Sequence, residues 1–426
     1  MKKHPAALIP HALFVLTVIY MVQYVINDGG NDLYIYRLGA ETIADGPGGP
    51  GLYEVSLDNY PFTYPPFAAL LFVPFALMPK EVGMALMMLI TAGIAWWLGW
   101  VITKYVSRRG VRIPLYEHLG TAGCASTLAL LIWASGPWRL TTHFGQINAV
   151  ILLLVLADFL RPATRVPRGV LIGIAGGIKL TPLAFGLILL LRKDWRGVAS
   201  VAGGFVGTIA LGFLAVPGEA AYYWGVAVRN TSRIGVTAFY DNVSLTGIFA
   251  HQGVPEPIAT VLVVALSLFL LVATAALMRL FIRANMVFSQ VALNAFLMLQ
   301  ISPISWSHHN TWYPVLLVAL CLEIFPLIMP AARPVVYVLS AFASVIALVG
   351  MYISPFWLAV LFSPKYSSHE MIYLPQGGAG LVAGSAPYAA MYLVVALVFL
   401  TYWAHRAAID ARVDSGRFRA PERPAP

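Results

Sequence analysis

Long apolar runs separated by short polar segments dominate this chain. Runs that we expect to form helices lie at 6–26, 66–79, 82–103, 119–136, 147–160, 169–191, 198–216, 257–281, 287–301, 312–329, 335–353 and 388–404. A helix that crosses a bilayer needs about 20 mostly apolar residues. The pattern therefore predicts an all-α, polytopic integral membrane protein with about 12 transmembrane helices.

Two of these runs depart from a simple span. The run at 66–79 is short and contains Pro66 and Pro74, so we expect it to make one net crossing together with 82–103. The run at 169–191 contains Lys179 and Pro182 near its middle, and basic residues flank it on both sides. Basic residues mark the cytoplasmic side, and proline interrupts a helix. We therefore predict a helical hairpin that bends at Lys-Leu-Thr-Pro and enters and leaves on the cytoplasmic side.

The same rule orients the rest of the chain. The polar segments at 27–65, 217–254 and 354–387 become outer loops, and both termini become cytoplasmic. We expect a single transmembrane domain over 1–405, followed by a disordered, basic cytoplasmic tail at 406–426, which is rich in proline and arginine.

Composition supports a membrane protein and narrows its partners. Hydrophobic residues make up 59% of the 426 positions and charged residues 11%, against roughly 25% charged in soluble domains. The net charge of +9 comes largely from short loops and the tail, a placement typical of membrane orientation. We therefore expect no nucleic-acid partner. Cys124 and Cys321 lie inside apolar runs, which excludes a disulfide framework and a thiolate zinc site.

The first outer loop is unusually acidic. It holds six of the chain's 18 acidic residues: Asp28, Asp32, Glu41, Asp45, Glu54 and Asp58. Carboxylates beside a bilayer are costly unless they meet water, cations or a substrate. The loop is therefore a candidate site, although carboxylates that only keep a loop solvated would give the same pattern.

Lys179 and a histidine pair add further candidate chemistry. A lysine inside an apolar segment is a functional hypothesis by default, and a lipid phosphate at the membrane boundary is an obvious partner for it. His308 and His309 suggest a metal pair, but adjacent helical residues point about 100° apart, so at most one would face a given ion. No HExxH pattern supports a metal.

Six short motifs, in this order, carry a resemblance to a known family: DLYIY at 32–36, PFTYPP at 61–66, GQIN at 145–148, IKLTP at 178–182, TSRIG at 231–235 and SPISWSHH at 302–309. The series resembles the actinobacterial polyprenyl-phosphomannose-dependent α-1,2-mannosyltransferases, which are membrane enzymes of the GT-C fold. The resemblance covers roughly residues 30–315. Members of that family elongate phosphatidylinositol mannosides or branch lipomannan in the cell envelope.

The resemblance implies an inverting glycosyltransferase with a catalytic carboxylate in the first outer loop. Asp32 matches that position and is the expected general base, with Asp58 as the second candidate. Lys179 and one of His308 and His309 would stabilise the leaving phosphate of the polyprenyl-phosphate-mannose donor. Further side chains that would bind substrate are Tyr64, Gln146, Asn148, Arg233 and Asn242. A lipid monophosphate can be met by protein cations, so we expect no obligatory metal or other cofactor.

Several alternatives stay open at this point. Transfer of another lipid-linked sugar such as arabinose fits the same scaffold, and a broken helix with a central lysine also fits a secondary transporter or flippase. The sequence identifies neither the acceptor nor the oligomeric state. We expect a plasma membrane protein with its active site on the outer face.

Overall fold

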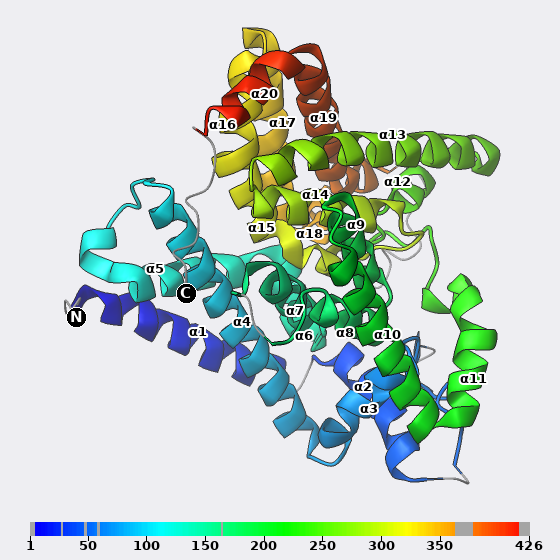
Figure 1. Cartoon of the computed structure of the whole chain (residues 1–426). Helices are drawn as coiled ribbons and strands as arrows, with labels where there is room; N and C mark the ends of the chain where they lie inside the picture. The colour runs from blue at the N-terminus through cyan, green and yellow to red at the C-terminus, as the bar shows by residue number, and fades with distance from the viewer. Residues whose placement is uncertain are drawn as a thin grey trace. The chain divides into compact units, whose positions relative to one another are not determined.

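The computed structural model describes residues 5–26, 29–46, 49–57, 60–162, 165–362 and 378–416 (Figure 1). Its α-helices are α1 (Leu8–Val25), α2 (Asn31–Ala44), α3 (Pro66–Ala76), α4 (Lys80–Arg108), α5 (Tyr116–Ala134), α6 (Gly136–Phe144), α7 (Asn148–Leu160), α8 (Val170–Ile178), α9 (Gly186–Leu191), α10 (Trp195–Ala215), α11 (Pro217–Gly225), α12 (Leu245–His251), α13 (Glu256–Arg283), α14 (Val287–Ile301), α15 (Tyr313–Ala319), α16 (Phe325–Ile328), α17 (Pro334–Ile353), α18 (Pro355–Leu361), α19 (Ala379–Ala404) and α20 (Arg406–Asp414).

Short elements connect these helices. The 3₁₀ turns are η1 (Pro5–Ala7), η2 (Thr181–Phe185), η3 (Ala227–Arg229), η4 (Thr231–Ile234), η5 (Ser307–Trp312) and η7 (Met329–Ala331), and η6 (Leu320–Ile324) is a π-helix. Within the described ranges the only strands are β1 (Ser56–Leu57) and β2 (Tyr60–Pro61), which pair antiparallel. The predicted all-α class is confirmed.

The chain divides into two compact units, and the single transmembrane domain predicted over 1–405 stays a prediction. Unit 1 comprises Met1–Ala134 and Arg139–Ile234, and unit 2 comprises Ser135–Trp138 and Gly235–Pro426. Both units are built from apolar helices, so composition along the chain carries no mark of the division.

In unit 1, α1 and α4 pack against α5, α2 packs against α3, and α8 packs against α10 (Figure 1). The approach of α8 to α10 requires glycine. A Cβ atom on Gly173 would lie 2.3 Å from the carbonyl oxygen of Val201, a distance that no side chain tolerates. This close packing fixes the end of α8, where Lys179 follows.

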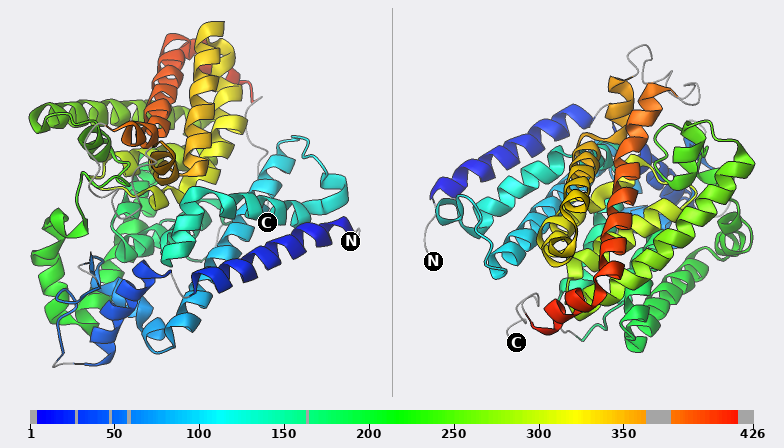
Figure 2. Two further views of the ribbon diagram at one scale, coloured as in Figure 1. Left: turned by 180° about the vertical axis from the view of Figure 1, so that it is seen from behind. Right: turned by 90° about the horizontal axis from the view of Figure 1, so that it is seen from above.

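In unit 2, α17 runs beside α19, as both views of Figure 2 show, and α13 packs against α14. A buried carboxylate organises the start of α14. Glu323 Oε2 accepts hydrogen bonds from the backbone N–H and the hydroxyl of Ser289, at 2.7 and 2.6 Å. The acceptor satisfies a helix-terminal N–H that would otherwise be buried without a partner.

Seven helices in the described ranges are long and apolar enough to cross a membrane, or eight if α5 and α6, bent by 77°, form one broken span. Four further apolar helices, including α3 and α14, are shorter. The predicted number of twelve spans is not confirmed. In the segment 66–103, α4 with 29 residues is a candidate span, whereas α3 has only 11 residues, and the single crossing stays a prediction.

Three segments that we expected to be irregular are helical. The acidic loop contains α2, which buries Leu33 and Tyr36. The loop predicted at 354–387 contains α18 and the first turns of α19. The tail contains α20, which buries Ile409 and Val413. Each of α2, α18 and α20 is too short to be recognised as a membrane span from the sequence, and each buries apolar side chains against other parts of the fold.

Candidate active site

Helix α2 places Asp32 in its first turn, in unit 1. The chain reaches the helix through Gly30, whose φ of 96° is readily adopted only by glycine. The Gly30 N–H donates to the His143 carbonyl at 2.7 Å, and the Arg37 guanidinium donates to the carbonyls of Phe75 and Met78. Both contacts fix the helix, so the position of the Asp32 carboxyl follows from a rigid element.

A tight turn brings Gln146 to the same place. Gly145 has a φ of 64°, and the Gln146 N–H donates to the Thr141 carbonyl at 2.9 Å. The Gln146 Oε1 atom accepts a hydrogen bond from the Tyr36 hydroxyl at 2.7 Å. Its Nε2 group lies 3.4 Å from the Tyr64 hydroxyl, and the side chain also hydrogen-bonds Asp32. The carboxamide of Gln146 therefore links Asp32 to two tyrosines.

Lys179 reaches this group from the break between α8 and η2. Its backbone is extended, with φ −148° and ψ 130°, which confirms the predicted helix break near Pro182. The Nζ atom donates to Asn148 Oδ1 at 3.3 Å and lies 5.7 Å from the centre of the Tyr64 ring. That both ends of the segment 169–191 lie on the cytoplasmic side stays a prediction.

The electrostatics of Asp32 suit a general base. Burial raises the pKa of the Asp32 carboxyl to about 6, while the positive charge of Lys179 and the hydrogen bond from Gln146 lower it. A base is most effective when its pKa lies near the working pH. Burial also raises the pKa of the Tyr64 phenol, so that this hydroxyl stays protonated and can donate.

Arg233 lies next to this group but its guanidinium already has partners. It donates to the carbonyls of Phe62 and Ala227, at 2.8 and 3.3 Å, and stacks 5.1 Å from the Tyr53 ring. Tyr53 in turn donates from its hydroxyl to the Tyr64 carbonyl at 3.0 Å. Through these contacts Arg233 holds Tyr53 and Phe62 in place, so its guanidinium serves the fold rather than substrate binding.

Unit 2 holds three further predicted site residues. His308 and His309 lie in η5 with their rings in edge contact, 4.7 Å apart, and the Trp306 N–H donates to His309 Nδ1 at 3.2 Å. Asn242 is fully buried. Its Nδ2 group donates to the carbonyls of Thr237 and Pro303, and its Oδ1 accepts from the N–H groups of Ser244 and Ser305. That amide has no hydrogen-bonding capacity left for a substrate.

Sequence reasoning missed two residues. Tyr36 is fully buried and holds Gln146, and its position four residues after Asp32 on α2 was a usable signal. Asp241 is buried in unit 2, where its Oδ2 accepts from the Ser307 N–H at 3.3 Å, directly before His308. No sequence pattern distinguishes it from any other loop aspartate.

The predicted residues thus divide between the two units. Unit 1 brings together Asp32, Tyr64, Gln146, Asn148 and Lys179, and keeps Arg233 nearby. His308, His309 and Asn242 belong to unit 2. Asp58 lies outside the described residues.

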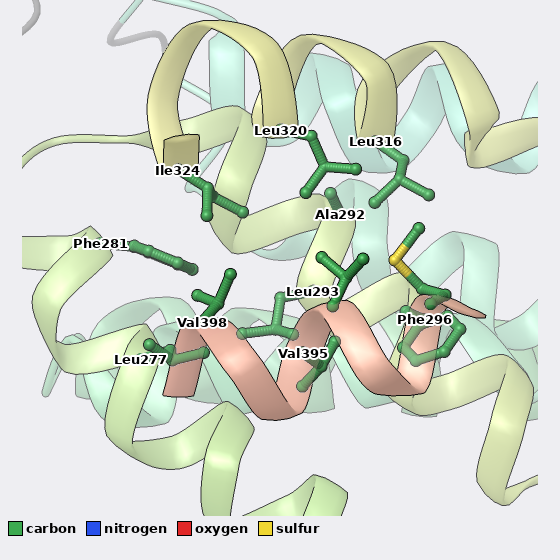
Figure 3. A pocket seen from close by; sticks show the side chains of 12 residues that line it. Leu277, Phe281, Ala292, Leu293, Phe296, Leu316, Leu320, Ile324, Val395 and Val398 are labelled. Carbon is green, nitrogen blue, oxygen red and sulfur yellow. The ribbon is translucent and has the colours of Figure 1, made fainter. Parts of the chain in front are cut away.

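Two further features of the described residues bear on chemistry. They contain no group of three or more His, Cys, Asp or Glu side chains arranged to hold a metal ion. A cavity in unit 2, between α13, α14, α15 and α19, is lined only by apolar side chains such as Phe281, Leu293 and Val395 (Figure 3). Its walls offer no group that binds a sugar or a phosphate.

Comparison with known proteins identifies the family of the chain. Residues 62–303 match the sequence profile of Glycosyltransferase family 87. The chain is 33% identical over 291 residues to a polyprenol-phosphate-mannose-dependent alpha-(1-2)-phosphatidylinositol mannoside mannosyltransferase of Mycobacterium tuberculosis, which covers 66% of this chain and 67% of the relative.

Two relatives from Mycolicibacterium smegmatis are similar at comparable levels. One carries the same description and is 31% identical over 309 residues, covering 67% of this chain and 69% of the relative. The other is described as a polyprenol-phosphate-mannose-dependent alpha-(1-2)-phosphatidylinositol pentamannoside mannosyltransferase and is 32% identical over 306 residues, covering 68% and 69%. No solved structure matches this chain significantly.

Proposed function

Since the chain belongs to glycosyltransferase family 87, we propose that it transfers mannose from a polyprenyl phosphate to a lipid-linked mannoside and forms an α-1,2 linkage. The acceptor would be a phosphatidylinositol mannoside or lipomannan, and the reaction would take place on the outer face of the plasma membrane. The relatives whose names describe this reaction support the proposal. No observation favours the arabinosyl or transporter alternative.

One observation carries the assignment of roles: a carboxyl group whose pKa is about 6 shares a cluster with a lysine ammonium group. Asp32 would accept the proton of the acceptor 2-hydroxyl as that oxygen attacks the anomeric carbon. The bond from this carbon to the phosphate oxygen breaks, and a β-linked donor gives an α product by inversion. The Lys179 ammonium would stabilise the phosphate as it leaves with its negative charge.

The remaining members of the cluster orient these two groups. Gln146 donates to Asp32 and is itself held by Tyr36, and Asn148 accepts from Lys179. A lipid monophosphate can be met by lysine alone, so we propose that transfer needs no metal. A contribution of His308 or His309 to the same step stays a prediction.

The test is transfer of radiolabelled mannose from polyprenyl phosphomannose to a phosphatidylinositol mannoside by the purified protein in detergent, with and without EDTA. We expect turnover in both conditions, and loss of transfer in Asp32→Asn with donor binding retained. Asp58→Asn is the matched control in the same segment. If the wild type makes no product from any mannosyl acceptor, the proposed reaction is wrong. If Asp58→Asn alone abolishes transfer, the base is misassigned.

A further inference from the structure

Two basic segments of unit 1 meet where α8 and α10 begin, and we call them together the basic patch. The first segment is 161–168 and the second is 192–196. A Cβ atom added to Gly169 would lie 2.3 Å from the Gly197 carbonyl oxygen, so the two backbones are in contact directly after these segments. The patch gathers six cationic side chains, which are Arg161, Arg165, Arg168, Arg192, Lys193 and Arg196.

A buried carboxylate and an aromatic ring hold the two segments in place. Asp158 Oδ2 accepts a hydrogen bond from the Gly169 N–H at 2.8 Å, and Asp158 Oδ1 accepts one from the Arg161 guanidinium at 2.9 Å. This guanidinium also donates to two backbone carbonyls of its own segment, at 2.7 and 2.6 Å. In the second segment, the Arg192 guanidinium lies 5.2 Å from the centre of the Phe159 ring. Both segments are thus fixed against the end of α7.

Carboxylates of the fold neutralise only part of the positive charge. Asp158 pairs with Arg161, and Asp194 caps α10. Like charges that gather on one surface repel one another, so an anion that binds among them lowers the electrostatic energy. Within the described ranges, no carboxylate forms an ion pair with the three exposed cations of the patch, which are Arg165, Lys193 and Arg196.

Exposed apolar side chains lie in the same two segments. Val166 is exposed by 48% and Trp195 by 64%. Trp195 is the first residue of α10, which has the composition of a membrane span and buries only 17% of its apolar window. A tryptophan at the end of a span lies at the level of the lipid head groups, and arginine and lysine beside it reach the phosphates. The patch is therefore built to face lipid head groups.

The basic patch is separate from the cluster of Asp32 and Lys179. α8 begins beside the patch and ends directly before Lys179. Its nine residues span ~14 Å at the rise of an α-helix. An anion at the patch and the phosphate of the proposed donor would therefore use different cations.

We infer that the basic patch binds the head group of an acidic phospholipid, with the phosphodiester among Arg165, Lys193 and Arg196 and the acyl chains along the exposed side of α10. Orientation in the membrane requires basic residues on a flank of an apolar segment. It does not require two flanks to meet on one surface beside an exposed tryptophan. The inference goes beyond mannosyl transfer and does not depend on it.

Lys193 and Arg196 allow a sharp test because both side chains are exposed and neither caps a helix. Replacing both by glutamine removes two charges from the patch. Arg108 and Arg112 are also exposed and lie at and just after the end of α4 in the same unit. The matched control is therefore Arg108→Gln with Arg112→Gln, which changes the net charge of the protein by the same amount.

The experiment measures binding of phosphatidylglycerol to the purified full-length protein in detergent at physiological ionic strength. Phosphatidylcholine is the zwitterionic comparison, and inorganic phosphate is the soluble competitor. Lys193→Gln with Arg196→Gln should weaken phosphatidylglycerol about twentyfold, because each lysine or arginine beside an anionic lipid contributes roughly fivefold. The matched control should bind as the wild type does. Arg165→Gln, which lies outside any helix, should weaken phosphatidylglycerol about fivefold.

Three outcomes would overturn the inference. An equal loss in the two double variants would show that net charge alone attracts the lipid. Equal binding of phosphatidylglycerol and phosphatidylcholine by the wild type would show that the patch does not select an acidic head group. Displacement of phosphatidylglycerol by an equal concentration of inorganic phosphate would show a site for soluble anions. Thermal unfolding of each variant without lipid, together with the single variant Arg165→Gln, separates a lost site from a damaged fold.

Discussion

Replacing Lys179 by glutamine should change the pH dependence of transfer as well as its rate. The Lys179 charge lowers the pKa of the Asp32 carboxyl, whose value of about 6 already includes this effect. When the Lys179 charge is removed, the effect of burial, which raises the pKa of Asp32, is no longer offset by that charge, so this pKa should rise. Because the base must be ionised to accept a proton, the variant should need a higher pH for the same fraction of active enzyme.

The size of the change follows from charge pairing. Loss of an opposite charge within about 4–6 Å raises a carboxyl pKa by ~1–3, and we take ~1.5 here. From a pKa of about 6, the carboxyl of the wild type would be about three-quarters ionised at pH 6.5, and that of the variant about one-tenth. The shift corresponds to ~2 kcal/mol. With each protein normalised to its own maximum, the variant should therefore be about eightfold less active than the wild type at pH 6.5.

The assay is kcat/KM for mannosyl transfer across pH 5–9, with each protein normalised to its own maximum. Normalisation removes any loss that Lys179→Gln causes by leaving the phosphate unneutralised, because that loss does not depend on the state of Asp32. Lys179→Arg keeps the charge and should keep the midpoint near 6. A midpoint that is the same in wild type and Lys179→Gln would refute the pairing of Asp32 with Lys179.

Three further predictions concern stability and the shape of the site. Asp32→Asn should raise the melting temperature at pH 7.5, because burial raises the pKa of this carboxyl from 3.8 to about 6 and so disfavours its ionised form in the folded protein. The gain in melting temperature should shrink as the pH falls through 6 towards 3.8. A gain that is equal at all pH values would contradict this prediction. Gly145→Ala should lower the free energy of unfolding by ~1–3 kcal/mol and remove most of the activity, because it places a side chain at a φ of 64° in a packed turn. Gly186→Ala is its control in thermal unfolding and transfer assays, because a Cβ added at Gly186 meets nothing within 4 Å. Asp158→Ala removes a buried carboxylate that accepts a hydrogen bond from the Gly169 N–H at 2.8 Å and pairs with Arg161. This variant should lower the free energy of unfolding by ~3–5 kcal/mol. The control Asp194→Ala, which removes a helix cap, should lower it by ~1 kcal/mol. Equal melting temperatures for these last two variants would show that the buried carboxylate at 158 contributes no more than a half-buried cap.

Much of the membrane architecture was predictable because it depends on local composition. Apolar runs of span length, basic flanks and the Lys-Leu-Thr-Pro break all act over a few neighbouring residues, and the break at Lys179 is where the sequence placed it. The helices in the acidic segment and the tail were missed. Each is short and amphipathic, and forms because its apolar face packs on another part of the fold.

The chemistry of the cluster could be predicted only in part. The sequence marked Lys179 because an ammonium group inside an apolar segment is costly. It marked Asp32 only through the resemblance of the DLYIY motif to the mannosyltransferase family, since cost alone did not separate it from the other carboxylates of the acidic loop. Only the tertiary structure decided that Gln146 links Asp32 to Tyr36 and Tyr64, since Tyr36 and Gln146, for example, are 110 positions apart and meet through packing.

Tertiary structure also decided what other polar residues do. The amide of Asn242 and the guanidinium of Arg233 resembled binding groups in sequence, yet the fold uses them on backbone carbonyls that would otherwise lack donors. Composition shows that a polar side chain near a bilayer needs a partner. Whether that partner is a substrate or the chain itself depends on which backbone groups the fold leaves unsatisfied nearby.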